Sequence, residues 1–139
     1  MIAWRAYSYT PQVRRGSMEY TYRPLVRVDL SGKDKTRSFM ALVDSGTDAT
    51  MMDLEIANIL EIDLGKSKKV TASGLGSTKP GFLAKLNIQV DQFDESMTFT
   101  VIFVEGLGFD AILGQDDFFR HFHVRFEREA KMFYLRPTP

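Results

Sequence analysis

Hydrophobic and polar residues alternate along most of this chain, and such alternation predicts β-strands with one buried face. The alternating segments are residues 20–30, 36–43, 86–90 and 99–103. Residues 31–34 and 91–95 are rich in turn-forming and acidic side chains, and they are expected to join these strands into two hairpins. An unbroken apolar run over residues 109–113, which ends at Gly114, predicts a further strand that is fully buried.

Helical spacing is limited to two short segments. Asp53 can cap a helix that runs to Leu60, because apolar residues recur there at helical spacing, and residues 63–65 supply a stop. Asp116 or Asp117 can cap a second helical turn. The chain is therefore expected to be mostly β, a small closed or sandwich-like barrel with one or two short helices.

The two ends of the chain carry weaker patterns. Residues 1–17 mix aromatic and basic side chains without a clear period, so we expect an arm or a partly ordered extension there. Residues 124–126 and 132–135 flank a turn and predict a closing hairpin. With 139 residues the chain fits one domain, expected over residues 20–136 after an extension over residues 1–19.

The composition excludes several classes of protein. With 44% hydrophobic and 26% charged residues, the chain is expected to be globular rather than disordered. Its 18 basic residues balance 18 acidic residues, so no net charge attracts nucleic acid or an anionic membrane. Cysteine is absent, which excludes disulfides, thiol nucleophiles and thiolate metal sites. No apolar run reaches the roughly 20 residues that cross a bilayer, and we expect a soluble cytoplasmic protein.

The strongest chemical signal is the position of Asp44. The apolar strand over residues 39–43 runs directly into Asp44-Ser45-Gly46-Thr47, so a carboxylate is placed at the end of a buried strand. Gly46 allows a sharp turn that brings its backbone N–H near this carboxylate, and the hydroxyls of Ser45 and Thr47 are small donors beside it. Such a loop can hold an acid without a basic partner.

A pair of such acids can hydrolyse a peptide bond. Two carboxyl groups at close range share one proton, so one acts as general base on water and the other as general acid. The chain contains a single Asp-Ser-Gly stretch, and the second carboxylate must come from another copy across a two-fold axis. A homodimer is therefore expected, with residues 132–135 either in a sheet between the subunits or in their own barrel.

Residues 41–48, Ala-Leu-Val-Asp-Ser-Gly-Thr-Asp, resemble the signature of the retropepsin-like aspartic proteases. Residues 111–114, Ala-Ile-Leu-Gly, are similar to the second signature of that family, a buried strand ending in glycine. Residues 73–77, which carry Gly74 and Gly76, resemble the flap, a hairpin that closes over bound peptide. The resemblance extends from about residue 20 to about residue 122 and implies a closed barrel of the acid-protease type.

The resemblance also implies a role for each residue of the site. Asp44 is the catalytic aspartate, Ser45 bonds across the dimer axis, and Thr47 bonds the outer oxygen of Asp44. The implied substrate-binding residues are Asp48, Ser73, Gly74, Leu75, Gly76 and Ile112. One position departs from the family pattern, because Gln115 stands where many retroviral members have an Arg that pairs with the residue corresponding to Asp48.

Other interpretations of these residues are less specific. Asp-Ser-Gly is common in surface turns, but the preceding apolar strand and the second signature favour a site. The glycines of residues 74–81 lack the Gly-Lys-Ser/Thr ending of a phosphate loop. His121 and His123 would lie on one side of a strand, yet no third metal ligand is evident, and a polar face is the simpler reading.

Two functions follow from the sequence. The first is an aspartic endopeptidase that uses a water nucleophile, needs no metal or cofactor, binds an extended peptide or protein substrate, and works best at mildly acidic pH because the dyad must hold one proton. The alternative is an inactive peptide-binding or dimerisation module with the same fold, which binds an extended segment by β-addition. The position of Asp44 favours the enzyme.

Overall fold

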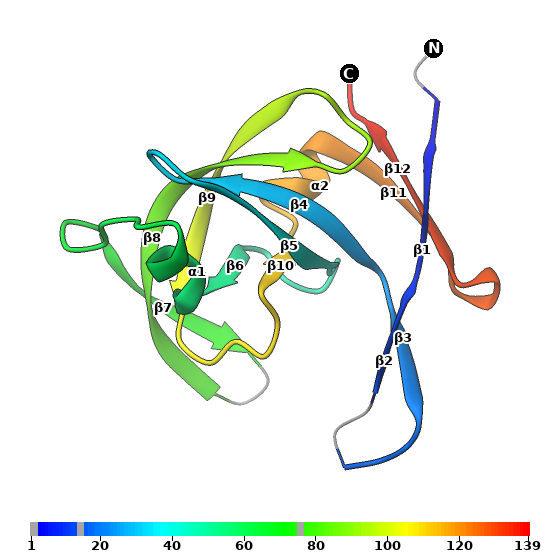
Figure 1. The fold of residues 1–139 in the computed structure, drawn as a ribbon, viewed down its shortest axis with the longest axis horizontal. Coiled ribbons are helices and arrows are strands. Elements are labelled where there is room, and N and C mark those ends of the chain that lie inside the picture. The colour runs from blue at the N-terminus through cyan, green and yellow to red at the C-terminus, as the bar shows by residue number, and fades with distance from the viewer. Residues whose placement is uncertain (1–2, 14–15, 75–76) are drawn as a thin grey trace.

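A computed structural model describes residues 3–13, 16–74 and 77–139 of the chain. Seven strands form its largest sheet: β4 (Leu25–Ser31), β5 (Thr36–Val43), β6 (Thr50–Asp53), β7 (Lys69–Gly74), β8 (Ser77–Val90), β9 (Ser96–Val104) and β10 (Ala111–Leu113). Their order is β4-β5-β10-β6-β9-β8-β7, and β4 also pairs with β8. This extra pairing closes six of the strands into a barrel (Figure 1) and confirms the predicted closed β fold.

The remaining elements lie at the ends of the chain and between the barrel strands. The other strands are β1 (Arg5–Ser8), β2 (Thr10–Val13), β3 (Tyr20–Arg23), β11 (Phe122–Glu127) and β12 (Met132–Pro137). Two short α-helices, α1 (Leu54–Ile59) and α2 (Phe118–His121), and one 3₁₀ turn (Arg128–Ala130) complete the described elements. The prediction of one or two short helices is thus confirmed.

The first predicted hairpin forms, but its leading strand is interrupted. β4 pairs with β5 in antiparallel register, and Val26, Val28 and Leu30 point into the core. Residues 20–30, expected as one strand, divide at Pro24 into β3 and β4. Proline has no N–H to donate to a sheet ladder. Its carbonyl remains available and accepts the Val43 N–H at 3.0 Å.

The second predicted hairpin also forms and is longer than the pattern indicated. β8 pairs with β7 at its start, with β9 along most of its length and with β4 at its end. Gly81 makes room for β9, since a Cβ atom built there would be 2.5 Å from the Ile102 side chain. The glycine therefore permits the strand to leave the β7–β8 hairpin and enter the barrel wall.

Helix α1 begins and ends as predicted, with Asp53 at its N-cap and Leu60 at its C-cap. The Asp53 carboxylate accepts the Glu55 N–H at 3.0 Å and caps the helix. The chain leaves the helix at Glu61, which has a left-handed φ of 56°, before residues 63–65 are reached. Glutamate is not a typical residue for that conformation, so the end at Leu60 was predicted but the residue that turns the chain there was not.

Helix α2 follows the predicted position without the predicted cap. Asp117 occupies the N-cap position, but its side chain makes no capping hydrogen bond. Burial raises the pKa of Asp117 above its usual value. His121 ends α2 while His123 lies in β11, so the two imidazoles do not share a strand as the sequence reading supposed. The Nδ1 atom of His121 lies 2.8 Å from the Asp117 carbonyl oxygen.

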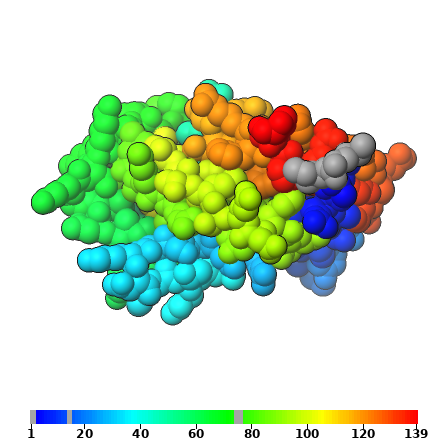
Figure 2. Space-filling model, turned by 90° about the horizontal axis from the view of Figure 1, so that it is seen from above, coloured from blue at the N-terminus to red at the C-terminus, as the bar shows by residue number. Residues whose placement is uncertain are grey.

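The N-terminal segment is ordered into two strands, although its sequence showed no clear period. β1 pairs with β12, which also pairs with β11, and this three-stranded terminal sheet is separate from the barrel. Tyr7 stacks on Phe133 with ring centroids 5.2 Å apart, and Tyr9 packs against the edge of the same ring. Figure 2 shows the N-terminal and C-terminal residues side by side. The alternation of Tyr7 and Tyr9 was too short to predict a strand.

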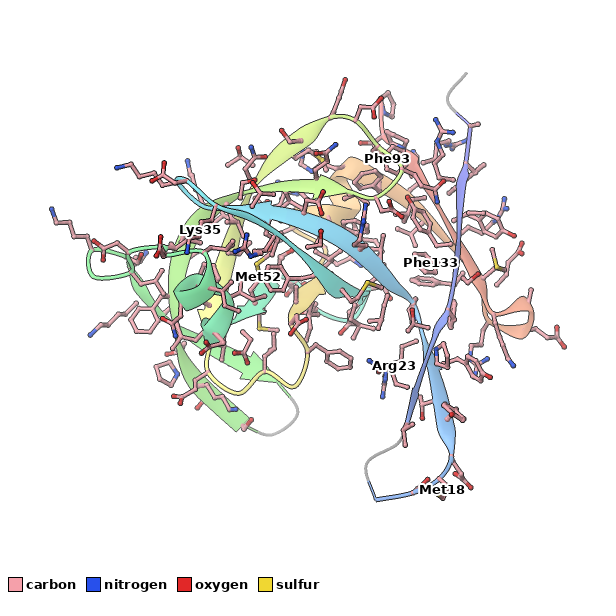
Figure 3. All side chains as sticks on the ribbon, viewed as in Figure 1. Met18, Arg23, Lys35, Met52, Phe93 and Phe133 are labelled. Atoms are coloured by element: carbon pink, nitrogen blue, oxygen red, sulfur yellow. The ribbon has the colours of Figure 1, made fainter. Side chains whose placement is uncertain are left out.

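The terminal sheet is joined to the barrel through one continuous core. Phe133 and Leu135 are fully buried with barrel residues such as Val28 and Phe99 (Figure 3). The Tyr7 hydroxyl donates to the Asp91 carbonyl at 2.5 Å, and burial raises the pKa of this hydroxyl. Residues 132–135 were expected in a sheet between subunits or in the barrel. Strand β12 instead pairs with β1 along one edge and with β11 along the other, both within the chain.

Strands β2 and β3 form a two-stranded ribbon that extends away from the barrel (Figure 1). Val13 lies opposite Tyr20 and both are exposed, as is Met18 at the far tip of the ribbon (Figure 3).

Within the described residues, no helix has the length and apolar character needed to span a membrane.

Candidate active site

Asp44 lies immediately after β5, at the point where β5 runs parallel to β10. The Asp44 N–H donates to the Leu113 carbonyl at 3.1 Å, so the ladder between the two strands continues up to the acid itself. Val43 and Leu113 are buried beneath it. A half-buried carboxylate is therefore fixed at the end of a central strand.

The loop after Asp44 orients this carboxylate through its backbone. The Gly46 N–H donates to Asp44 Oδ1 at 2.8 Å. The Thr47 hydroxyl donates to the Ala49 carbonyl at 3.2 Å, whereas the family resemblance implied a bond to Asp44. Within one chain, the amide of Gly46 is thus the group that holds the acid, and Thr47 stabilises the turn that follows.

The segment after β10 supports the loop from behind. The Gly114 N–H donates to the Thr50 hydroxyl at 3.2 Å, and Thr50 is fully buried. A Cβ atom at position 114 would lie 2.6 Å from the Ala49 carbonyl oxygen and 2.9 Å from that of Asp48. Only glycine lets the two segments approach this closely, which gives the Ile-Leu-Gly signature a physical reason.

Gln115 ties the same segment to the Asp44 loop. Its side-chain Nε2 donates to the Ser45 carbonyl at 2.8 Å, and its backbone N–H donates to the Thr47 carbonyl at 2.9 Å. The next amide, of Asp116, donates to the Asp48 carbonyl at 2.8 Å. From the sequence, Gln115 was noted only because it cannot form the ion pair that an Arg would make with Asp48. The structure shows a neutral tether in its place, made to the loop backbone.

A pocket of about 430 Å³ opens above Asp44. Its polar side is formed by the Asp44 loop and the β7–β8 hairpin, through Asp44, Thr47, Ser73, Ser77 and Lys79. Its apolar side includes Met51, Val104, Leu107 and Ile112. An extended chain could enter this space, with its side chains on the apolar wall and its backbone near the acid.

The predicted site residues fall into three groups. Those that line the pocket are Asp44, Gly46, Thr47, Ser73 and Ile112. Ser45 and Asp48 are exposed beside the loop and do not line the pocket of a single chain, and Gly74 ends β7. Leu75 and Gly76 lie outside the described residues.

Several residues that line the pocket were missed by the sequence analysis, and Met51 and Lys79 are two of them. Met51 adjoins the buried Met52 in β6, and its turn towards the pocket is visible only once β6 pairs with β10. Lys79 lies in a hairpin that reads as solvent-exposed, and its role depends on the loop after β9, with which it makes contact. The local sequence pattern does not predict that either residue lines the pocket.

The geometry supports acid–base chemistry by Asp44. Asp44 is the one acid among the described residues that line the pocket, and no ion pair between described residues involves it. A carboxylate held by an amide and left without a basic partner can accept or donate a proton to a molecule in the pocket.

Comparisons with known proteins give one family match and two similar structures. The family model for the retroviral aspartyl protease matches residues 20–126. A retropepsin-like aspartic protease from Rickettsia conorii is similar in structure, with a TM-score of 0.58 and 15% identity over 99% of this chain and 96% of that chain. EIAV protease complexed with the inhibitor HBY-793 has a TM-score of 0.50 and 18% identity over 68% of this chain and 83% of that chain. No match was found among curated proteins.

The two structural likenesses differ in extent. The likeness to the Rickettsia protein covers nearly the whole chain and therefore includes the N-terminal strands, which the sequence could not align with any relative. At 15% identity this likeness concerns the fold alone. The aligned region thus includes the segments that form the terminal sheet in this chain.

Proposed function

The chain belongs to the retroviral aspartyl protease family, and from this membership we propose that it is an aspartic endopeptidase whose dyad consists of Asp44 from each of two subunits. The observation that carries the proposal is the position of Asp44, at the end of a buried strand, held by the Gly46 amide and facing a pocket. A peptide-binding module has no need of an acid fixed in this way.

The proposed reaction needs two carboxyl groups that hold one proton between them. The ionised carboxyl removes a proton from a water molecule, which attacks the peptide carbonyl, while the protonated carboxyl donates to the carbonyl oxygen. The carboxyl that took the water proton then gives it to the leaving nitrogen, and the other carboxyl takes back a proton from a hydroxyl of the tetrahedral intermediate. The intermediate collapses to the two products, and the dyad again holds one proton. The amide of Gly46 keeps one oxygen of Asp44 in place during this exchange, because it bonds the same Oδ1 in either protonation state.

A second copy of the chain completes the site in this proposal. The pocket of one chain supplies Asp44 as its one acid among the described residues. A two-fold axis beside the Asp44 loop would bring a second Asp44 within reach of the first. Both the exposed Ser45 and the exposed Asp48 would then face the partner or the substrate backbone, which agrees with their absence from the pocket of the isolated chain.

Cleavage that is sensitive to an aspartic-protease inhibitor tests this proposal. Purified protein should cut denatured protein substrates at mildly acidic pH, pepstatin should block the cutting, and sedimentation should give the mass of a dimer. Binding of substrates without any inhibitor-sensitive product would favour the inactive peptide-binding module instead. Inhibitor-sensitive activity from a strictly monomeric species would overturn the shared dyad.

Gln115 is expected to act as a positioning residue for the dyad. Replacing Gln115 by Ala removes the bond to the Ser45 carbonyl and keeps the backbone bond to Thr47. Because Gln115 is exposed and water can replace part of the lost bond, kcat should fall only about three- to tenfold, with KM nearly unchanged. Steady-state kinetics measure the two constants separately.

A matched pair of variants gives this prediction its control. Gln115→Glu presents a carboxylate to the Ser45 carbonyl and should lower kcat more than Gln115→Ala does. Gln12→Ala, on the remote strand β2, should leave both constants unchanged. Equal kinetics for the wild type and both Gln115 variants would mean that the backbone bonds alone hold the loop.

A further inference from the structure

The pocket that contains Asp44 is also lined by a cation, Lys79. Lys79 lies in β8 directly opposite Ala72 of β7, and both residues line the pocket that contains Asp44. Side chains alternate along a strand, so Ser77 shares the face of Lys79 and also lines the pocket. The lysine therefore belongs to the pocket face of the β7–β8 hairpin.

The ammonium group of Lys79 is held in a defined place by the loop that follows β9. Its Nζ donates to the Glu105 carbonyl at 3.3 Å and to the Gly106 carbonyl at 3.2 Å. A Cβ atom at position 106, where φ is +68°, would lie 3.4 Å from this Nζ. Gly106 thus provides both the turn and the space that the lysine head group occupies.

Lys79 has no carboxylate partner among the described residues. Two carbonyl groups engage two of the three N–H donors of the ammonium, and the third is available to a bound molecule. None of the ion pairs formed between described residues involves Lys79. Among the described residues that line the pocket, Lys79 is the one cation and Asp44 the one anion.

The neighbours of this ammonium define what it can accept. Val104 and Leu107 flank the carbonyl groups that hold Lys79, and both line the same pocket. A substrate side chain with an aliphatic stem and a terminal carboxylate would fit the apolar wall with its stem and the ammonium with its head. We propose that this part of the pocket is a subsite for an acidic substrate side chain, glutamate or aspartate, and that Lys79 selects it.

This inference rests on the proposed function, since it names the substrate class of the same site. An ammonium–carboxylate hydrogen bond is stronger than a neutral one, and it gains further when peptide covers the pocket and excludes water. Because Lys79 is exposed in the free protein, we expect a moderate preference, roughly tenfold for glutamate over glutamine.

Cleavage of a peptide library by the wild type, by the two Lys79 variants and by a control variant tests the subsite. The assay is run near pH 6, above the ordinary carboxyl pKa of about 4.3, so that glutamate side chains are ionised. The wild type should favour acidic residues about tenfold at one position relative to the cleaved bond. Lys79→Met, which keeps the aliphatic stem, should abolish that preference, and Lys79→Glu should shift it towards lysine and arginine.

Lys85→Met is the matched control, because Lys85 is an exposed lysine of the same strand that does not line the pocket. It should retain the wild-type preference. A wild-type profile with no acidic preference, or a preference that survives Lys79→Met, overturns the subsite while leaving the protease intact.

A binding experiment covers the case in which the protein does not cleave peptides. The Asp44→Asn protein, with and without Lys79→Met, is exposed to an array of peptides in matched glutamate and glutamine versions. Stronger binding of the glutamate versions that depends on Lys79 supports the subsite even without turnover. If the Asp44→Asn protein that retains Lys79 binds the glutamate and glutamine versions equally, the proposed subsite is overturned.

Discussion

Replacement of Asp44 by Asn should lower kcat/KM for peptide cleavage by about a thousandfold or more, because the amide can neither take a proton from water nor share one with the opposite carboxyl. The Asn side chain retains the shape of the acid and can still accept the Gly46 N–H. The fold and the dimer should therefore remain, which circular dichroism and sedimentation would verify.

The shared nature of the dyad can be tested separately. Differently tagged wild-type and Asp44→Asn subunits can be co-expressed and the mixed dimer isolated by both tags. If each active site needs both carboxyl groups, this mixed dimer is as inactive as the doubly substituted one. Asp34→Asn, in the exposed turn between β4 and β5, is the control and should keep full activity. A mixed dimer with half of the wild-type activity would contradict the proposed mechanism.

Replacement of Phe133 by Ala should have the largest effect on stability, a loss of about 3–5 kcal/mol in the free energy of unfolding. Phe133 is fully buried and contacts the rings of Tyr7, Tyr9 and Phe126, so its removal leaves a cavity between the terminal sheet and the barrel. Urea denaturation at a fixed protein concentration measures this loss, because dimerisation would make stability depend on concentration.

Two further variants give losses of stability with which that of Phe133→Ala can be compared. Phe133→Leu fills most of the cavity and should cost clearly less than Phe133→Ala. Phe126→Ala removes a ring of the same sheet that is 40% exposed, and it should cost about 1 kcal/mol or less. If Phe133→Ala is no more harmful than Phe126→Ala, the terminal sheet does not share the core of the barrel.

The barrel could be predicted from the sequence because its pattern is local. Val26, Val28 and Leu30 alternate with polar residues and lie on the core face of β4, as they must when one face of a strand is buried. Asp53 was identified as a cap for the same reason, since its carboxylate acts two residues away. The order β4-β5-β10-β6-β9-β8-β7 is set by contacts between distant segments, and no local pattern specifies it.

The site was only partly predictable, for a related reason. Asp44 and Gly46 belong to one turn, so a short motif contains their whole geometry. The tether made by Gln115 joins positions 70 residues apart, and the anchoring of Lys79 joins positions 26 and 27 residues apart. Such contacts depend on how loops meet in space, and the amino acids at either end carry no signal of their partner.

The pairing of β1 with β12 has a consequence for biosynthesis. Ser8 and Met132, which meet across this ladder, are 124 positions apart, so β1 cannot form the ladder until β12 has been synthesised. During that interval the rings of Tyr7 and Tyr9 have no Phe133 to pack against. The nascent chain can fold its barrel strands early, but the terminal sheet forms only after β12 has been made.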